Sequence, residues 1–197
     1  MKFSSVSIGK KDEKWLSVVN GNSVKIQAGG LDIWENRDEF HFCYMEHTGD
    51  FTIAAKLESF RMSDLYAKAG IMARETLEDT SPHVFFTAFP DNSKRNNNNG
   101  GYEFQYRQIE GDVSYAIYPS DFTVEPPMHP VFCPQTWLKL IRKENAFLSY
   151  SSENGTDWKL YSSYELPLPK KLYLGMAVTS HNENEITTAV FSEVSVI

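Results

Sequence analysis

The sequence predicts an all-β fold, a two-sheet antiparallel β-sandwich of the jelly-roll type. First, aromatic residues, which favour strands, make up 14% of the chain. Second, short segments of alternating apolar and polar residues, each bounded by turn residues, recur about every ten residues. Third, helical periodicity exceeds one turn nowhere except at 63–67 and near Leu77. So many antiparallel strands must close a barrel or stack as two sheets, and the long segments favour two sheets.

The first half of the chain contains the clearest strand patterns. Segment 83–89 is apolar on both faces, which is typical of a central strand that is covered on both sides. Segment 68–74 alternates, so that one face would carry Ala69, Ile71 and Ala73 and the other Lys68, Gly70, Met72 and Arg74. The strands expected in this half are a weak one at 24–27 and stronger ones at 40–45, 51–60, 68–74 and 83–89.

Two irregular connections interrupt the strands of the second half. Residues 91–101 are polar and rich in asparagine, so we expect a hairpin loop that buries nothing. Residues 119–136 are rich in proline, which removes donors from a strand ladder, so we expect a long irregular connection. The strands expected here are 102–107, 113–118, 137–142, 146–151, 158–162, 172–180 and 187–196.

Length and composition favour one domain over residues 1–197, with residues 1–29 as N-terminal strands pinned to one sheet. A chain of 197 residues is near the size of a single domain of about 150 residues. Apolar residues make up 41% and charged residues 23%, an ordinary globular composition. No apolar run approaches the roughly 18 residues of a membrane span, so we expect no membrane partner.

Charge and cysteine content exclude other classes of function. The net charge of −7 argues against a nucleic-acid partner, because such binding relies on clustered Lys and Arg. Cys43 and Cys133 form no CxxC motif or Cys/His cluster that would indicate zinc, and a disulfide between them stays open. Residues 1–9 do not resemble a signal peptide. We therefore expect a cytoplasmic protein with reduced thiols.

Several blocks of sequence resemble, in the same order, a widespread β-sandwich module. The matching blocks include Leu31-Asp32-Ile33-Trp34, Lys68-Ala69-Gly70-Ile71-Met72-Ala73-Arg74-Glu75, Trp137-Leu138-Lys139-Leu140-Ile141-Arg142 and the most specific one, Tyr173-Leu174-Gly175-Met176-Ala177-Val178-Thr179-Ser180-His181. The resemblance is to the concanavalin A-like lectin/glucanase superfamily, in the branch that includes the fungal "regulation of enolase" protein. It covers residues 30–197 and implies a concanavalin A-like jelly roll, a fold that hosts lectins, hydrolases, lyases and scaffolds.

The strand at 102–107 carries the best candidate for a ligand site. Carboxylate, amide and guanidinium groups beside aromatic rings suit a saccharide, since they bind hydroxyls in pairs while rings stack on the sugar. The alternative is a structural Arg–Glu ladder across a solvated face. Trp34 lies in a loop-like segment and would stack at the rim, or else pack in the core. The predicted ligand-binding residues are Arg74, Glu103, Gln105, Arg107 and Trp34.

Catalytic and metal-binding patterns are weak. Glycosidases use two carboxyl groups, and glucanases of this superfamily carry theirs close together on one strand. Here Glu103 stands alone, with Gln105 where a second carboxylate would sit, so we predict no catalytic residue. No histidine pair has ligand spacing, and we expect no metal site and no cofactor. A structural calcium ion at a loop aspartate stays open against simple turn chemistry, the candidates being Asp32, Asp38 and Asp50.

These observations lead to three functional hypotheses. The first is a non-catalytic binding module for a saccharide or carbohydrate-derived ligand on the concave sheet face. The second, implied by the family resemblance, is a protein-interaction or regulatory factor that acts on a metabolic enzyme. The third is a glycoside hydrolase or lyase that uses Glu103 as acid or base.

Overall fold

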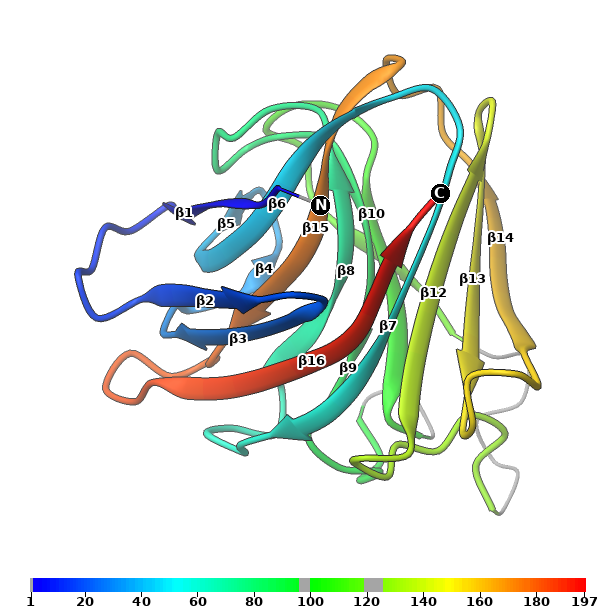
Figure 1. Ribbon diagram of the computed structural model, residues 1–197. Coiled ribbons are helices and arrows are strands. Elements are labelled where there is room, and N and C mark those ends of the chain that lie inside the picture. Colours follow the sequence, from blue (N-terminus) through cyan, green and yellow to red (C-terminus); the bar gives the residue numbers. More distant parts are fainter. Residues whose placement is uncertain (1, 96–99, 119–125) are drawn as a thin grey trace.

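The computed structural model describes residues 2–95, 100–118 and 126–197 and shows two large antiparallel sheets that face each other (Figure 1). The predicted all-β sandwich is confirmed, and the described residues contain no helix. The short stretches with helical periodicity, at 63–67 and near Leu77, form bends and turns. Within the described ranges no helix is therefore available to cross a membrane.

Each large sheet has seven strands. In spatial order, sheet A consists of β1 (Ser4–Ile8), β6 (Phe40–Thr48), β15 (Lys171–Thr179), β8 (Lys68–Arg74), β9 (His83–Ala88), β10 (Tyr102–Arg107) and β11 (Tyr115–Ile117). Sheet B consists of β14 (Lys159–Glu165), β13 (Ala146–Ser152), β12 (Thr136–Lys143), β7 (Phe51–Phe60), β16 (Thr187–Val196), β3 (Ser23–Ala28) and β2 (Leu16–Asn20). A small third sheet pairs β4 (Ile33–Trp34) with β5 (Arg37–Asp38).

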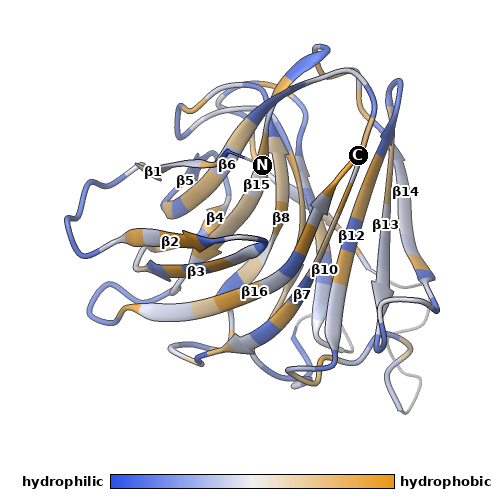
Figure 2. Ribbon diagram, viewed as in Figure 1, coloured by the Kyte–Doolittle hydropathy of each residue, from blue (hydrophilic) through white to orange (hydrophobic). Residues whose placement is uncertain are grey.

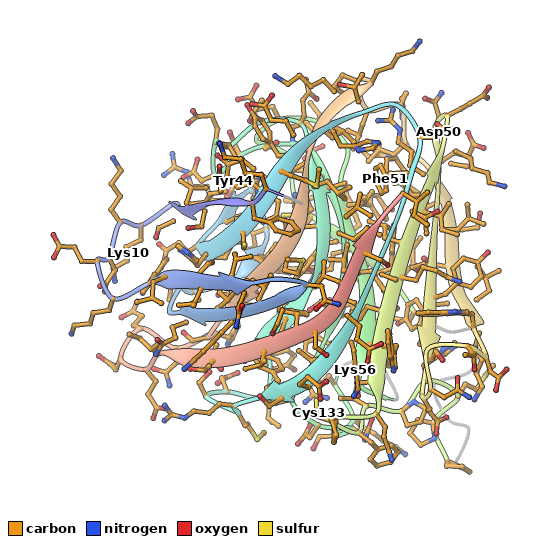
Figure 3. All side chains as sticks on the ribbon, in the orientation of Figure 1. Lys10, Tyr44, Asp50, Phe51, Lys56 and Cys133 are labelled. Atoms are coloured by element: carbon orange, nitrogen blue, oxygen red, sulfur yellow. The ribbon has the colours of Figure 1, made fainter. Side chains whose placement is uncertain are left out.

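The main core fills the space between sheets A and B. Alternation along each strand sends one set of side chains inward, as the sequence predicts for Ala69, Ile71 and Ala73 of β8, all of which are buried. Apolar residues recur along the strands of both sheets, and the connecting loops are largely hydrophilic (Figure 2). Phe51 belongs to this core, whereas Lys10 projects from the loop between β1 and β2 (Figure 3).

A second apolar cluster lies on the other face of sheet A, which points away from sheet B. It contains Phe40 and Phe42 of β6, Met72 of β8 and Phe85 of β9, all fully buried. This cluster is covered by residues 31–39, which we call the covering segment and whose Ile33 packs into the cluster. We call this surface of sheet A its outer face; it carries the candidate site.

The covering segment is held in place by backbone geometry and by loops of sheet A. Gly30 has φ of +109°, and a Cβ there would lie 2.1 Å from the carbonyl oxygen of Glu39, so only glycine fits this entry. The Thr179 hydroxyl donates to the same carbonyl oxygen of Glu39 at 2.9 Å. These contacts fix where the segment crosses the sheet.

The N-terminal strands are divided between the sheets rather than pinned to one. β1 pairs with β6 at one edge of sheet A. β2 and β3 pair with each other, and β3 continues sheet B through β16.

Cys43 is buried and Cys133 exposed, and both are free thiols.

The two predicted irregular connections are described in part. Residues 96–99 of the Asn-rich loop and 119–125 of the Pro-rich connection lie outside the described residues. The described parts contact each other, because Asn92 donates to the carbonyl oxygen of Val131 at 2.9 Å and accepts from its N–H at 2.7 Å. This pairing explains why a polar residue is half-buried in a loop predicted to bury nothing.

Candidate functional site

A pocket of about 210 Å³ opens on the outer face of sheet A, at one end of the sheet. Its position follows from strand direction, since β8 and β10 begin at this end whereas β9, β11 and β15 finish there. The pocket is lined by Asp32, Trp34, Tyr66, Lys68, Phe89, Glu103, Gln105, Tyr118 and His181. Three of the predicted ligand-binding residues, Trp34, Glu103 and Gln105, therefore come together here.

The floor of the pocket is formed by polar side chains of β8 and β10. Glu103 and Gly70 both lie opposite Thr87 of β9, so the first residues of β8 and β10 lie at the same level of the sheet. Lys68, Glu103 and Gln105 all lie on the outer face, with exposures of 3%, 6% and 0%. Three nearly buried polar groups on one small floor need partners from the protein or from a ligand.

Lys68 finds its partner in the covering segment. Its ammonium group bonds the carboxylate of Asp32, which lies on the side wall of the pocket. Burial acts to raise the pKa of Asp32, but the charge of Lys68 and a hydrogen bond from His181 outweigh it, so the pKa lies below its ordinary value. Asp32 is therefore an ion-paired carboxylate at neutral pH.

His181 connects the covering segment to the loop before β8. Its Nε2 lies 3.4 Å from Asp32 and its Nδ1 lies 3.0 Å from Asp64. The hydrogen bond to Asp32 raises the pKa of His181 despite partial burial. The ring also contacts Tyr66 at a centroid distance of 5.4 Å, so His181 joins two loops at the pocket wall.

Glu103 and Gln105 have different hydrogen-bonding states. Burial raises the pKa of Glu103, against the charge of Lys68 and hydrogen bonds from Tyr118 and Gln105. The amide nitrogen of Gln105 donates to the Glu103 carboxyl group. The amide oxygen of Gln105 is buried and has no hydrogen-bond partner among the described residues. This oxygen can accept a hydrogen bond from a ligand.

Aromatic rings contribute four of the nine lining residues: Trp34, Tyr66, Phe89 and Tyr118. Tyr66 meets Phe89 edge-on at 6.4 Å. The guanidinium group of Arg95 lies 4.5 Å from the centre of the Phe89 ring and donates to the carbonyl oxygen of Leu65. The loops that carry these rings are thus tied together, which holds the aromatic wall in place.

The structure corrects the prediction for Arg74 and Arg107, which do not reach this pocket. Both are 0% exposed at the opposite end of the same face. Arg107 binds Asp38 through two nitrogens, at 2.7 and 2.9 Å, and Arg74 binds it at 3.3 Å. Asp38 is also fully buried, so this group, which we call the arginine cluster, is a closed structural unit.

Strand register explains why Arg74 and Arg107 lie far from Glu103. β8 and β10 run in the same direction on either side of β9, and Arg74 and Arg107 both lie opposite His83. Glu103 is four residues before Arg107, a distance of about 13 Å along a strand. Gly70 is the β8 residue at the level of Glu103, so the nearer basic residue of β8 is Lys68, two residues before Gly70.

Sequence reasoning missed Lys68, Phe89 and Tyr118 as site residues. Each stands at or just beyond the end of a predicted strand, a position that indicates a sheet edge but not which edges meet. Asp32 was a calcium candidate in a loop, whereas Tyr66 and His181 were not predicted as site residues, because the separation of the three along the chain hid their proximity. The missing information was the register and the path of the covering segment.

The calcium candidates have other partners. Asp38 is neutralised by the arginine cluster, and Asp32 by Lys68. Asp50 accepts the backbone N–H of Glu144 at 2.8 Å, which is a contact across 94 residues of chain and not a local turn bond. In the three described ranges, no group of three or more His, Cys, Asp or Glu side chains is placed to hold a metal ion.

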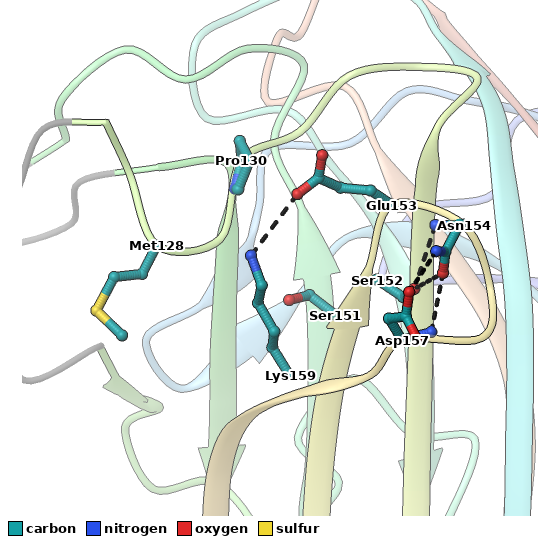
Figure 4. A pocket seen from close by; sticks show the side chains of 8 residues that line it. All are labelled: Met128, Pro130, Ser151, Ser152, Glu153, Asn154, Asp157 and Lys159. Atoms are coloured by element: carbon teal, nitrogen blue, oxygen red, sulfur yellow. Dashed lines mark hydrogen bonds and ion pairs between the residues drawn. The ribbon is translucent and has the colours of Figure 1, made fainter.

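Another pocket, of about 280 Å³, lies beside the hairpin that follows β13 (Figure 4). Its polar groups bond one another: Glu153 pairs with Lys159 at 3.7 Å, and Asn154 donates to Asp157 at 2.8 Å. The Ser151 hydroxyl is 2.7 Å from Nδ1 of His129. None of the described residues that line it is aromatic. The pocket on sheet A, with aromatic walls and an unpaired acceptor, is the better candidate.

Comparison with protein families decides the membership of the chain. Residues 10–197 match a family described as "Protein of unknown function (DUF1349)". The chain belongs to this family. No curated protein sequence matches the chain significantly.

Solved structures show the fold of this DUF1349 member. A functionally unknown protein from Saccharomyces cerevisiae is 16% identical, with a TM-score of 0.67 over 99% of this chain and 95% of that one. The carbohydrate-binding module CBM66 from Bacillus subtilis is 15% identical, with a TM-score of 0.55 over 98% and 94%. The exoplasmic/lumenal domain of VIP36 in its Ca²⁺/Man2-bound form is 11% identical, with a TM-score of 0.51 over 96% and 80%.

These similarities confirm the concanavalin A-like jelly roll. At such low sequence identity they establish the fold alone, and it is a fold shared with carbohydrate-binding proteins.

Proposed function

We propose that this protein is a non-catalytic binding module for a saccharide or carbohydrate-derived ligand, and that the ligand occupies the pocket on the outer face of sheet A. The observation that carries the proposal is the fully buried amide oxygen of Gln105, unpaired among the described residues in a pocket walled by aromatic rings. The fold, shared with a carbohydrate-binding module and with the VIP36 domain in its Ca²⁺/Man2-bound form, supports the same class of ligand.

The chemistry of the pocket suits hydroxyl groups on a ring. A buried acceptor without a partner costs about 1–3 kcal/mol, and a ligand hydroxyl that donates to Gln105 recovers much of it. Glu103 and Asp32 offer further oxygens near the floor and wall. Trp34 and Tyr118 supply apolar surface against which the carbon face of a sugar can pack.

The arrangement favours binding over hydrolysis. A glycosidase needs one carboxyl group that gives a proton and another that is free to attack or to activate water. Asp32 is bound to Lys68 and His181, and the Glu103 carboxyl accepts hydrogen bonds from Gln105 and Tyr118. Both carboxyl groups are thus engaged in holding the pocket together.

A cytoplasmic location is part of the proposal, since both cysteines are free thiols.

The test is a thermal-shift screen of neutral mono- and oligosaccharides, with and without calcium, followed by calorimetric titration of each hit. Gln105→Met removes the unpaired acceptor and should weaken binding at least tenfold. Gln108→Met, the same change at an exposed residue just beyond β10, should leave the affinity unchanged. Binding that Gln105→Met does not weaken, or no saccharide binding by the folded protein, would overturn the proposal. The latter would favour a protein partner.

A further inference from the structure

The shape of the pocket limits how much of a saccharide it can hold. Its volume of about 210 Å³ equals the liquid volume of roughly seven water molecules. Pockets for drug-sized ligands hold about 300–1,000 Å³. The space thus suits one sugar ring with its hydroxyl groups rather than several units.

The covering segment closes the path along the sheet. From the pocket toward the arginine cluster, the outer face is occupied by Ile33, which is fully buried against Met72 and Phe85. Trp34 stands at the boundary, and its carbonyl oxygen accepts from Arg107 at 3.0 Å. A glycan chain therefore cannot continue along the strands in this direction.

The remaining sides of the pocket carry walls as well. Tyr66 and Phe89 stand at the end of the sheet, where β8 begins and β9 finishes. His181 follows β15 on one flank, and Tyr118 follows β11 on the other. The pocket is a walled pit that opens away from the sheet, not a groove that runs across it.

Among the described residues that line the pit, every cation has an acidic partner. The ammonium group of Lys68 is bound by Asp32, and His181 lies between Asp32 and Asp64. Glu103 adds a further acid, so acidic side chains are at least as many as basic ones. The carboxylate of a uronic acid has no proton to give to Gln105 and would add negative charge beside these acids.

We propose that the pocket holds a single terminal unit of a neutral saccharide and rejects acidic sugars. This inference rests on the proposed function and specifies its ligand. The terminal unit enters the pit, its hydroxyl donates to Gln105, and the rest of the glycan extends into solvent.

The experiment compares chain length and charge by calorimetric titration of the whole protein. The probes are the methyl hexoside of the neutral sugar identified in the screen, its di-, tri- and tetrasaccharides with the same terminal unit, and the matching methyl hexuronide. Affinity should stay within about threefold from one unit to four, because the described walls of the pit offer no subsite for additional units. The hexuronide should bind at least tenfold more weakly than the hexoside.

A variant tests the charge argument independently. Glu103→Gln removes one acid from the floor and should narrow the difference between hexoside and hexuronide. Glu153→Gln, the same substitution in the pocket beside the hairpin, should leave that difference unchanged.

Each part of the inference has its own contradicting result. Affinity that rises more than tenfold between one and three units would overturn the single-unit pit, while saccharide binding itself stands. Equal or tighter binding of the hexuronide would overturn the rejection of acidic sugars, as would a difference that Glu103→Gln does not narrow. If no probe binds the folded protein, the proposed function fails together with the inference.

Discussion

Both ends of the outer face of sheet A carry ion pairs between basic and acidic side chains, but the pocket lies at only one of them. At one end, Arg74 and Arg107 bind Asp38, and all three side chains are 0% exposed. At the other end, Lys68 binds Asp32 above Glu103 and Gln105, and a pocket remains. The difference is that charged side chains fill the first end, whereas the second end keeps a pocket of about 210 Å³.

At the arginine cluster the donor groups are used by the protein itself. Arg107 donates to Asp38 and to the backbone carbonyl oxygens of Trp34, Glu35, Asp79, Ser81 and Asp112. Arg74 donates to carbonyl oxygens of Thr76 and Glu78 as well as to Asp38. The guanidinium groups are thus held by the protein itself, and their bonds fix the loops that carry the pocket wall.

The largest effect should come from opening the arginine cluster. Arg107→Ala leaves Asp38 buried with fewer partners and frees the loop that carries Trp34. We expect a loss of about 3–5 kcal/mol in the free energy of unfolding, measured by urea denaturation. Arg37→Ala is the control, because Arg37 is exposed and its ion pair with Asp79 spans 3.9 Å, so its loss should stay within about 0.5 kcal/mol. Equal losses in both variants would contradict the account.

A fall in pH should lower the free energy of unfolding through His83, whose ring lies 3.7 Å from Asp38 of the arginine cluster. Burial lowers the pKa of His83 to about 4, whereas the unfolded chain has its ordinary value of about 6.5. Between these values the unfolded state binds the proton, so stability falls as the pH drops, by a total on the order of 3 kcal/mol. His83→Gln should remove this part of the acid sensitivity, measured as unfolding free energy at pH 7 and pH 4.5. An unchanged pH dependence would show that His83 is not buried as a neutral ring.

A smaller effect should follow from breaking the ion pair at the pocket. Lys68→Met leaves the Asp32 carboxylate, which keeps 26% of its side chain exposed, without its cation. Because Asp32 is partly solvated, we expect a loss of about 1–2 kcal/mol in stability. The double variant Asp32→Asn/Lys68→Met should recover most of this loss, since it removes the unpaired charge. Additive losses in the double variant would mean that the two side chains do not interact.

The smallest effect on stability should come from His181. Its pKa is raised by folding, whereas that of His83 is lowered, so the two histidines change stability with pH in opposite directions. Its bond to Asp32 raises the pKa of His181, so the folded state holds the proton more tightly than the unfolded state. The stabilisation is full below the unfolded value of about 6.5 and is lost as the pH rises through the folded value. Wild type should exceed His181→Gln in stability at pH 5.5 by less than about 1 kcal/mol, and by less still at pH 8.5. A difference that grows with pH would refute this linkage.

The sequence was sufficient for the fold but only partly for the site. Alternation along 68–74 and 102–107 predicts which side chains share a face, and the structure agrees for Lys68, Glu103 and Gln105. Alternation does not reveal register, so Arg74 was placed with Glu103, although Lys68 is the basic residue of β8 that lies nearer to it. It also cannot show that residues 31–39 fold back over the sheet.

The covering segment explains the positions of Asp38 and Trp34. Asp38 appeared as a loop aspartate with turn chemistry or calcium as its role, yet it is the buried anion between two arginines. Trp34 was expected at the rim of a site, and it does line the pocket, with its carbonyl oxygen bound by Arg107. Both positions depend on contacts across 36 or more residues of chain, which no local pattern encodes.

The most direct test of the central claim is a crystal structure of the protein with the neutral saccharide that gives the strongest hit. The account predicts one sugar ring in the pocket on sheet A, with a hydroxyl group within hydrogen-bond distance of the Gln105 amide oxygen. A sugar bound instead in the pocket beside Glu153 and Lys159, or elsewhere with Gln105 still unpaired, would contradict it.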